Sequence, residues 1–220
     1  GDFSYSLTLH AFDIFRDNVD RPLLAQKINA SRFIVTVSEF NRAFMLRNLP
    51  GVNPQRIRVN YNGIDTEMFQ MNGASREPNT ILAVGRLIEK KGFIHLVRAA
   101  GRLRDRRQEV KCTIVGDGPQ EAELQTEIDK LNLQNVVTLA GPRSQSEVRD
   151  MMSRSACFAL PCVHAADGNV DALPTVLLEA MASGCPCVNT TVSGVPEIIE
   201  HGYLYIAQPP LYGVKRGRSM

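Results

Sequence analysis

From Thr80 onward, apolar runs of strand length alternate with segments whose apolar residues recur at helical spacing. The apolar runs are TILAVG (80–85), VKCTIVG (110–116), NVVTLAG (135–141), CFALPC (157–162) and CPCVNT (185–190). Strands that alternate with amphipathic helices are typical of βαβ units on a parallel sheet with right-handed crossovers. The pattern therefore predicts an α/β fold with a Rossmann-like, doubly wound sheet, whose ligand binds beyond the carboxyl ends of the strands.

The first 62 residues predict a partial second Rossmann-like unit. SRFIVTVS is strand-like, SEFNRAFMLRNL is helix-like and IRVNYN is again strand-like. The turn signal Asn62-Gly63 and the polar stretch that follows it predict a linker over 63–79, so that the main domain covers 80–201. The chain opens at GDFSYSLTLH without an initiator Met, and we interpret it as starting partway through a larger protein.

The segment 202–220 departs from the βαβ pattern. It holds three of the five tyrosines of the chain, meets a double Pro and then turns basic in VKRGRSM. We expect this segment to be an atypical tail that does not continue the Rossmann domain.

Composition narrows the class of protein. An apolar fraction of 44% and a charged fraction of 22% are ordinary for a soluble globular chain, and no run is long enough for a membrane helix. The net charge of +2 is too small to indicate nucleic acid as the main partner, which we therefore do not expect. The five cysteines lack the paired C-x2-C spacing of zinc sites, so we expect buried thiols in a reducing compartment, the cytoplasm.

A cluster of arginines follows the first strand of the main domain. The helix predicted over 93–107 carries five of them away from its apolar face: Arg98, Arg102, Arg104, Arg106 and Arg107. A solvated helix face is the plainer interpretation, and contact with a membrane surface is the alternative.

Two basic residues bracket the loop GRLIEKKG between the first strand and its helix. Arg86 lies just past the strand and Lys91 just before the helix, where backbone N–H groups already favour an anion. Arginine binds phosphate through two donors and lysine adds a compact charge. No Asp-x-Asp pair is present to hold a divalent ion, which favours a diphosphate site without metal. Exposed loop charges are the alternative.

Two acids flank Pro174 in DALPTVLLEAMASGCPCVNT. Pro174 suits the first helical position, which leaves Asp171 in the preceding loop and Glu179 on the helix. Both carboxylates can then approach one polyhydroxylated ligand near the positive end of the helix dipole. Solvated charges on an ordinary αβ unit are the alternative.

Three weaker candidates lie at other strand ends. Gly116 and Gly118 in GDGP either let the backbone approach a nucleotide or make a tight turn, and Arg143 in AGPR is a candidate for holding the base. GxGxxG is absent, which excludes the usual dehydrogenase fingerprint. His10 follows the strand-like SLTL and is a candidate for facing a cleft.

Four segments follow one another in a specific order: GRLIEKKG, VGDGP, DALPTVLLEAMASGCPCVNT and SGVPEIIEHG. Together they resemble the donor-binding half of the family 4 retaining glycosyltransferases with the GT-B fold. LHAFDIF, FIVTVSEFNR and NGIDTEMF are similar to the end of the acceptor half of that family. The resemblance implies a transferase that uses a nucleotide-sugar as substrate and needs neither metal nor cofactor. It also implies a glycan or lipid-linked acceptor, polysaccharide biosynthesis, and a cytoplasmic location with peripheral contact at the inner face of the membrane.

The resemblance also implies roles for single residues. Arg86 and Lys91 would hold the donor diphosphate, Glu179 the ribose hydroxyls, and Asp171 would lie near the donor sugar. His10 would reach the transferred sugar, and Glu197 in GVPE belongs to the same donor pattern. Two departures from the family pattern are Asp171 in place of Glu and Ala172 in place of Gly, the second of which is expected to stiffen the loop.

Most of the acceptor half that this family uses has no counterpart in the sequence. A non-catalytic nucleotide-sugar-binding module and a GT-B-type sugar-nucleotide epimerase therefore stay open as alternatives. GYLYIAQPPLYGVKRGRSM resembles a short segment of the DNA gyrase B subunit, which implies a junction near His201–Gly202.

Overall fold

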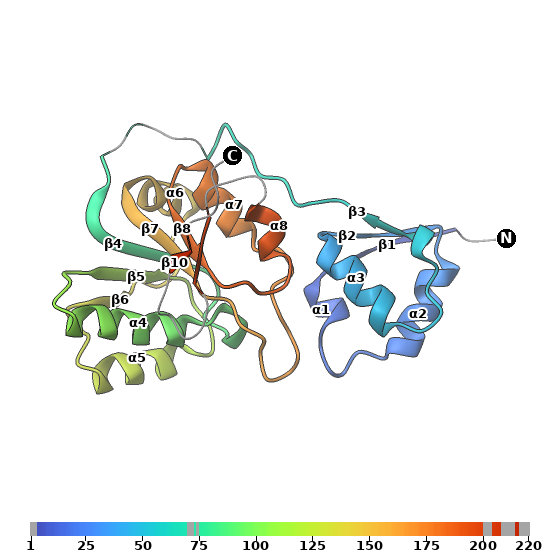
Figure 1. Cartoon of the computed structure of the whole chain (residues 1–220), viewed down its shortest axis with the longest axis horizontal. Helices are drawn as coiled ribbons and strands as arrows, with labels where there is room; N and C mark the ends of the chain where they lie inside the picture. Colours follow the sequence, from blue (N-terminus) through green and yellow to red (C-terminus); the bar gives the residue numbers. More distant parts are fainter. Residues whose placement is uncertain (1–3, 70–72, 74, 200–203, 208–213, 216–220) are drawn as a thin grey trace.

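The computed structural model describes residues 4–69, 73, 75–199, 204–207 and 214–215. The described chain forms two α/β units, each built on its own sheet (Figure 1). The first sheet ends at Val59 and the second begins at Glu77, three residues before the strand expected from Thr80. The predicted α/β class is confirmed.

The smaller unit is a parallel sheet with three described strands in the order β1-β2-β3. Its elements are β1 (Ser6–Leu9), α1 (Ala11–Ile14), α2 (Arg21–Ala30), β2 (Phe33–Thr36), α3 (Glu39–Asn48), the 3-10 turn η1 (Pro54–Arg56) and β3 (Ile57–Val59). Ile28, Ile34 and Met45 are fully buried between the helices and the sheet. The Ser38 side chain accepts the Asn41 N–H and thereby caps α3.

The larger unit is built on a second sheet, described in the order β10-β9-β8-β7-β4-β5-β6. Its first strands are β4 (Glu77–Val84), β5 (Lys111–Val115) and β6 (Val137–Leu139), followed by β7 (Ser155–Leu160) and β8 (Cys187–Asn189). All five predicted strands are present and parallel. Because β4 lies between β5 and β7, the strand order reverses there, and this switch point is where open α/β sheets bind ligands.

Helices cover both faces of the larger sheet (Figure 1). α4 (Phe93–Asp105) and α5 (Glu121–Lys130) lie together on one face, and α6 (Gln145–Arg154) and α7 (Thr175–Ala182) lie on the other. Phe93, Phe158 and Leu82 are buried at the centre. Pro174 is the residue before α7 and not, as expected, its first residue, and Gly184 follows the end of the helix in the left-handed conformation.

The segment 202–220 differs in part from the prediction. β9 (Leu204–Ala207) pairs in parallel with β8, and β10 (Val214–Lys215) pairs antiparallel with β9. The expectation that this segment leaves the Rossmann sheet is therefore wrong for 204–207. The run LYIA is short, apolar and rich in strand-forming residues, and the double Pro comes only after it. The junction at His201–Gly202 lies outside the described residues, and the resemblance to gyrase B stays a prediction.

The cysteines of the described chain form no disulfide, and four of the five are buried. Burial raises the pKa of the Cys112 thiol to about 12, so this group stays protonated at neutral pH. The expected buried thiols are thus present. In the parts that the structure describes, no helix combines the length and apolarity needed to cross a membrane.

Candidate functional site

Two loops meet at the switch point of the larger sheet. One follows β4 and ends in the 3-10 turn η2 (Glu89–Lys91), and the other follows β7 and leads to α7. Gly92, with φ 68°, lies so close to the second loop that a Cβ would stand 1.9 Å from the Pro161 carbonyl oxygen. The Val163 N–H also donates to the Lys90 carbonyl at 3.0 Å. The packing leaves no alternative to glycine at this position.

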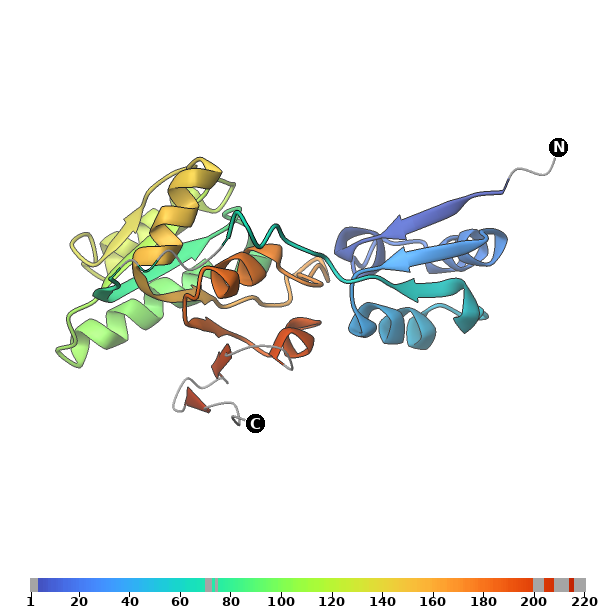
Figure 2. The ribbon, with the colours of Figure 1, turned by 90° about the horizontal axis from the view of Figure 1, so that it is seen from above.

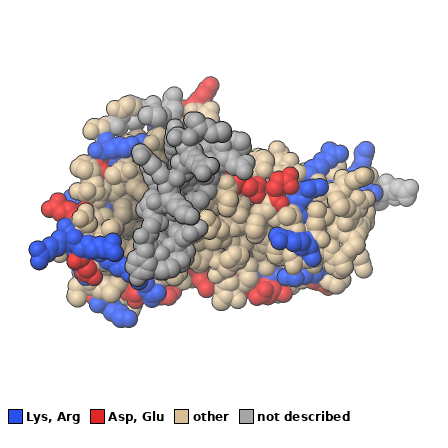
Figure 3. Space-filling view, in the orientation of Figure 1, with Lys and Arg blue, Asp and Glu red and all other residues tan. Residues whose placement is uncertain are grey.

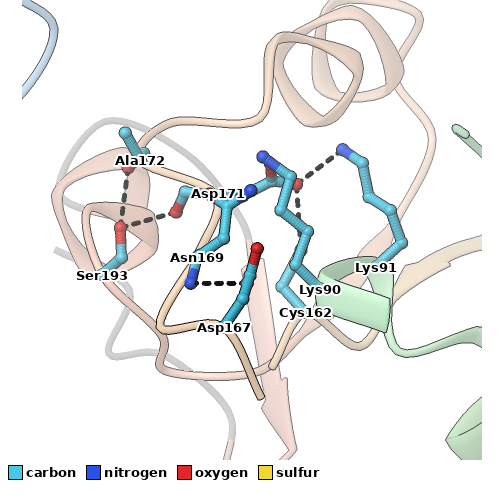
Figure 4. A network of polar contacts seen from close by, with 8 residues as sticks. All are labelled: Lys90, Lys91, Cys162, Asp167, Asn169, Asp171, Ala172 and Ser193. Atoms are coloured by element: carbon cyan, nitrogen blue, oxygen red, sulfur yellow. Dashed lines mark hydrogen bonds and ion pairs between the residues drawn. The ribbon is translucent and has the colours of Figure 1, made fainter. Parts of the chain in front are cut away.

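Asp171 brings its carboxylate between two lysines of the first loop (Figure 4). Lys90 Nζ lies 2.9 Å from Asp171 Oδ1, and Lys91 Nζ lies 2.5 Å from Oδ2. The three side chains are only 16%, 14% and 12% exposed. Burial pushes the pKa of Asp171 upward, but the ammonium groups of Lys91 and Lys90 outweigh it and hold this pKa below its ordinary value. The aspartate is therefore ionised at neutral pH.

The backbone around Asp171 is fixed by the turn before α8 (Val195–Ile199). Ser193 Oγ donates to the carbonyl oxygens of Asp171 and Ala172 at 2.6 and 3.1 Å. The Gly194 N–H also donates to the Ala172 carbonyl, at 3.1 Å. These bonds hold the loop that carries Asp171 in one position, and the stiffening expected from Ala172 itself stays a prediction.

Arg86 and Glu179 belong to the same edge of the sheet but not to the ion-paired cluster. Arg86 is exposed just beyond β4, and its side chain has no ion pair among the described residues. Glu179 lies half-buried on α7, and burial raises the pKa of its carboxyl. Within the described chain no side chain or backbone group donates to this carboxylate. As far as the described residues go, both groups are thus available to a ligand, whereas Lys91 is already paired.

Gly116 and Gly118 allow the loop after β5 to pack against the loop after β4. Their φ angles are 136° and 153°, and a Cβ would lie 2.0 Å from the Gly85 oxygen at the first and 2.5 Å from the Leu87 oxygen at the second. The Leu87 N–H donates to the Asp117 carbonyl at 2.7 Å. Tight packing alone accounts for both glycines, and contact with a nucleotide stays a prediction.

Arg143 and His10 lie apart from the lysine–aspartate cluster. Arg143 is exposed beyond β6, and its Nη1 lies 3.7 Å from Glu147 Oε1. In the sheet, β4 and β5 lie between β6 and β7. His10 is exposed directly after β1, and its backbone N–H donates to the Asp13 carboxylate at 2.9 Å. Figure 2 shows the strands of the smaller sheet directed toward the larger unit, which places His10 at the facing edge.

Glu197 forms hydrogen bonds to groups outside the larger unit. Its carboxylate accepts the backbone N–H groups of Glu39 and Phe40 at 2.8 and 2.7 Å, and the Tyr61 hydroxyl at 2.9 Å. All three donors belong to the smaller unit or to the segment that leaves it. The carboxylate thus caps α3 across the boundary between the units, where the helix dipole favours a negative charge. In this structure Glu197 joins the two units, and its assignment to the donor stays a prediction.

A second contact joins the units near the same cluster. Arg16 Nε lies 3.1 Å from Asp167 Oδ2, and the Asp17 N–H donates to the Asp167 carbonyl at 3.0 Å. Asp167 belongs to the loop that carries Asp171, so the loop at the switch point also contacts the smaller unit. The carboxyl ends of both sheets therefore border the same boundary.

Two of the five arginines on and just after α4, Arg98 and Arg104, contact neighbouring groups. Figure 3 shows basic and acidic side chains mixed over the region of α4 and α5. Arg98 Nε lies 2.6 Å from Glu127 Oε1, and Arg104 donates to Asp105 and to the Leu131 carbonyl. These contacts favour a solvated, ion-paired face. No group of three or more potential metal-ligating side chains occurs among the described residues.

Lys90 is the residue that the sequence interpretation missed. The available signal was the doubled lysine in EKKG, of which only the second was assigned. Adjacent residues in a 3-10 turn point in different directions, but here both ammonium groups converge on one carboxylate from another loop.

Curated proteins with similar sequences are named glycosyltransferases and related synthases. The amylovoran biosynthesis glycosyltransferase AmsK of Erwinia amylovora is 38% identical over 153 residues, which cover 69% of this chain and 38% of AmsK. The alpha-maltose-1-phosphate synthase of Mycobacterium tuberculosis is 32% identical over 188 residues, which cover 79% of this chain and 47% of that protein. The chain thus spans less than half the length of these two relatives.

Solved structures show the same fold at lower identity. HepE of Anabaena, in complex with UDP, has a TM-score of 0.75 at 21% identity over 94% of this chain and 58% of HepE. The pneumococcal O-GlcNAc transferase GtfA, in complex with UDP and GlcNAc, has a TM-score of 0.72 at 15% identity, over 94% of this chain and 42% of GtfA. These likenesses establish the architecture.

A match to a protein family agrees with these relatives. Residues 65–210, more than half of the chain, match the family described as "Glycosyl transferases group 1". The match includes the lysine–aspartate cluster, Glu179 and β9. The chain belongs to the group 1 glycosyl transferases.

Proposed function

We propose that this chain carries the donor-binding part of a retaining glycosyltransferase, which transfers a sugar from a nucleotide-sugar to a glycan or lipid-linked acceptor. The observation that supports this most directly is the pair of lysines at the switch point of the larger sheet, next to an ionised loop aspartate. Cations fixed at a helix N-terminus are suited to a diphosphate.

The chemistry of transfer requires a stabilised leaving group. Breaking the bond between sugar and diphosphate leaves negative charge on the phosphate oxygens, and fixed cations stabilise that charge in the transition state. Lys91 and Arg86 supply these cations without a metal ion. No strong general acid is needed, in contrast to a glycosidase with its two flanking carboxyls.

The remaining donor contacts come from the two acids. Glu179 lies half-buried with a carboxylate that no described group occupies, and it is suited to accept hydrogen bonds from the ribose hydroxyls. Asp171 lies closer to the lysines and is suited to orient the donor sugar. His10, at the end of β1, approaches the transferred sugar from the facing unit, where the acceptor binds.

The relatives support the substrate class. HepE and GtfA were solved with UDP, and AmsK is named for the biosynthesis of amylovoran. We therefore propose a UDP- or GDP-linked donor, a role in polysaccharide or lipid-linked glycan synthesis, and a cytoplasmic location with peripheral contact at the inner membrane face.

The test is a titration of the chain with a panel of nucleotide sugars by calorimetry. At least one UDP- or GDP-sugar should bind, and the double change Arg86→Ala with Lys91→Ala should abolish binding. Lys111→Ala, which removes an exposed lysine at the start of β5, is the control. Survival of nucleotide affinity in the double variant would show that the phosphate assignment is wrong.

A non-catalytic binding module is the second candidate, since the chain covers only 38% of AmsK. Transfer to an acceptor, or hydrolysis of the donor, by the isolated chain would exclude it. An epimerase would instead convert the donor alone into an epimeric sugar nucleotide, which product analysis would reveal.

A further inference from the structure

We infer that the carboxylate of Asp171 occupies the cation site of the donor diphosphate in the donor-free protein, and that donor binding displaces it from Lys91. This inference rests on the proposed function, because it concerns the lysine assigned to the diphosphate. It adds that the Asp171 carboxylate and the donor diphosphate compete for the same lysine.

The geometry that supports this inference is the separate attachment of the two lysines. Lys90 Nζ contacts Oδ1 at 2.9 Å and Lys91 Nζ contacts Oδ2 at 2.5 Å, so each ammonium group holds its own oxygen of the carboxylate (Figure 4). Loss of the Lys91 contact therefore leaves the Lys90 contact intact. The carboxylate stays neutralised by one lysine while the other turns to the phosphate.

The loop backbone is fixed, so the side chain of Lys91 is the part that can move. Ser193 holds the carbonyl groups of Asp171 and Ala172, and Gly92 is packed against Pro161 without space for a Cβ. A lysine side chain, in contrast, has four rotatable bonds and a compact charge. Displacement of Asp171 from Lys91 then requires a change of rotamer and no movement of either loop.

The charges determine the direction of the effect. Two ammonium groups and one carboxylate leave a single net positive charge in the cluster, which a diphosphate meets as it enters. As long as Asp171 contacts Lys91, its negative charge lies one ion-pair length from the lysine nitrogen and repels the phosphate oxygens. Part of the affinity of the site for the diphosphate is therefore lost in separating this ion pair.

The experiment measures UDP affinity by calorimetry in single and double variants. Asp171→Asn keeps the shape of the side chain but removes the competing charge, so UDP should bind about tenfold more tightly, a typical size for coupling between two ligands of one site. Asp167→Asn makes the same charge change four residues away, where the partner is Arg16, and should alter the affinity less than about twofold. Lys91→Met should weaken UDP binding.

The double variant separates competition from a general effect of charge. If Asp171 acts by occupying Lys91, the gain from Asp171→Asn should disappear in the Lys91→Met background. A gain of equal size in both backgrounds, or no gain from Asp171→Asn at all, overturns the inference. UDP affinity that is insensitive to Lys91→Met contradicts the proposed function itself, so the two failures are distinguishable.

A measurement on the unmodified chain covers the case in which Asp171→Asn fails to fold. The ammonium nitrogens of Lys90 and Lys91 are followed by NMR in protein labelled at lysine, with Lys90→Arg and Lys91→Arg for assignment. UDP should shift the Lys91 signal and leave that of Lys90 close to its original position. Equal shifts of both signals, or a shift of Lys90 alone, contradict the displacement.

Discussion

The two units of this chain share one architecture but differ in what lies at the carboxyl ends of their strands. In the larger unit, three loops are packed so tightly that Gly92, Gly116 and Gly118 have no space for a Cβ. A buried ion-paired cluster lies between the loops that follow β4 and β7. In the smaller unit, the end of β1 presents the exposed His10. The larger unit thus fixes its charged side chains by close backbone packing, whereas His10 of the smaller unit remains exposed at the end of its strand.

The largest expected effect is on the rigid side of this comparison. Gly92→Ala should lower the free energy of unfolding by about 3 kcal/mol or more, because its Cβ would meet the Pro161 oxygen and φ is 68°. Gly141→Ala is the matched control, since Gly141 has the same φ of 68° and no atom within 4 Å of the added Cβ. It should cost only about 1 kcal/mol. Chemical denaturation of both variants provides the comparison, and equal losses would show that the close approach is unimportant.

The link between the units is the next target. Glu197→Ala removes three hydrogen bonds that cross from α8 to the smaller unit, each worth about 1–3 kcal/mol when a charged group accepts it. Faster hydrogen exchange at the Glu39 and Phe40 amides is expected, with little change in UDP affinity.

A helix cap within the larger unit is the control for Glu197. Glu147→Ala removes a similar cap, at Ser144, and should leave exchange at α3 unchanged. Loss of UDP affinity in Glu197→Ala, without faster exchange at α3, would instead support the original assignment of Glu197 to the donor.

The ion-paired cluster should make stability depend on pH. The pKa of Asp171 is lower in the folded chain than in the unfolded chain. Its contribution to the free energy of unfolding is therefore fully present above the unfolded pKa, near 4, and is lost as pH falls through the folded pKa. Asp171→Asn should therefore be less stable than the parent by about 1–3 kcal/mol at pH 7, with a difference that shrinks below about pH 4. Urea denaturation at several pH values measures this. A difference that does not vary with pH would contradict the role of the ion pair.

The smallest expected effect concerns Glu179. Its pKa is raised by burial, so its ionised form is disfavoured in the folded chain, and stability decreases as pH rises from the unfolded pKa through the folded one. Glu179→Gln should increase stability at pH 7, by no more than about 0.5 kcal/mol because the group is half exposed, and should weaken UDP binding. Thermal denaturation and calorimetry test the two effects. A loss of stability would show that the carboxylate has a structural partner.

The regular parts of the fold followed from sequence pattern alone. The run TILAVG and the other apolar runs became parallel strands, and the helix predicted from Phe93 begins there. Local signals of this kind arise from periodicity and caps, which act over a few residues. β9 was missed because the sequence change at 202–220 was interpreted as the end of the sheet.

Contacts between distant segments could not be predicted in the same way. The bonds from Glu197 to α3 join residues more than 150 positions apart, and no local pattern indicates them. The pairing of Lys90 with Asp171 depends on two loops that meet only after the sheet has formed. The motif placed Lys91 and Asp171 at neighbouring strand ends, where the structure brings them together, but it did not indicate that they pair with each other.

The most direct test of the central claim is a crystal structure of the chain with UDP bound. The account predicts the diphosphate at the switch point, within hydrogen-bonding distance of Lys91 Nζ and the Arg86 guanidinium, with the ribose hydroxyls on the Glu179 carboxylate. UDP bound elsewhere, or bound at the switch point without contact to Lys91 and Glu179, would contradict it.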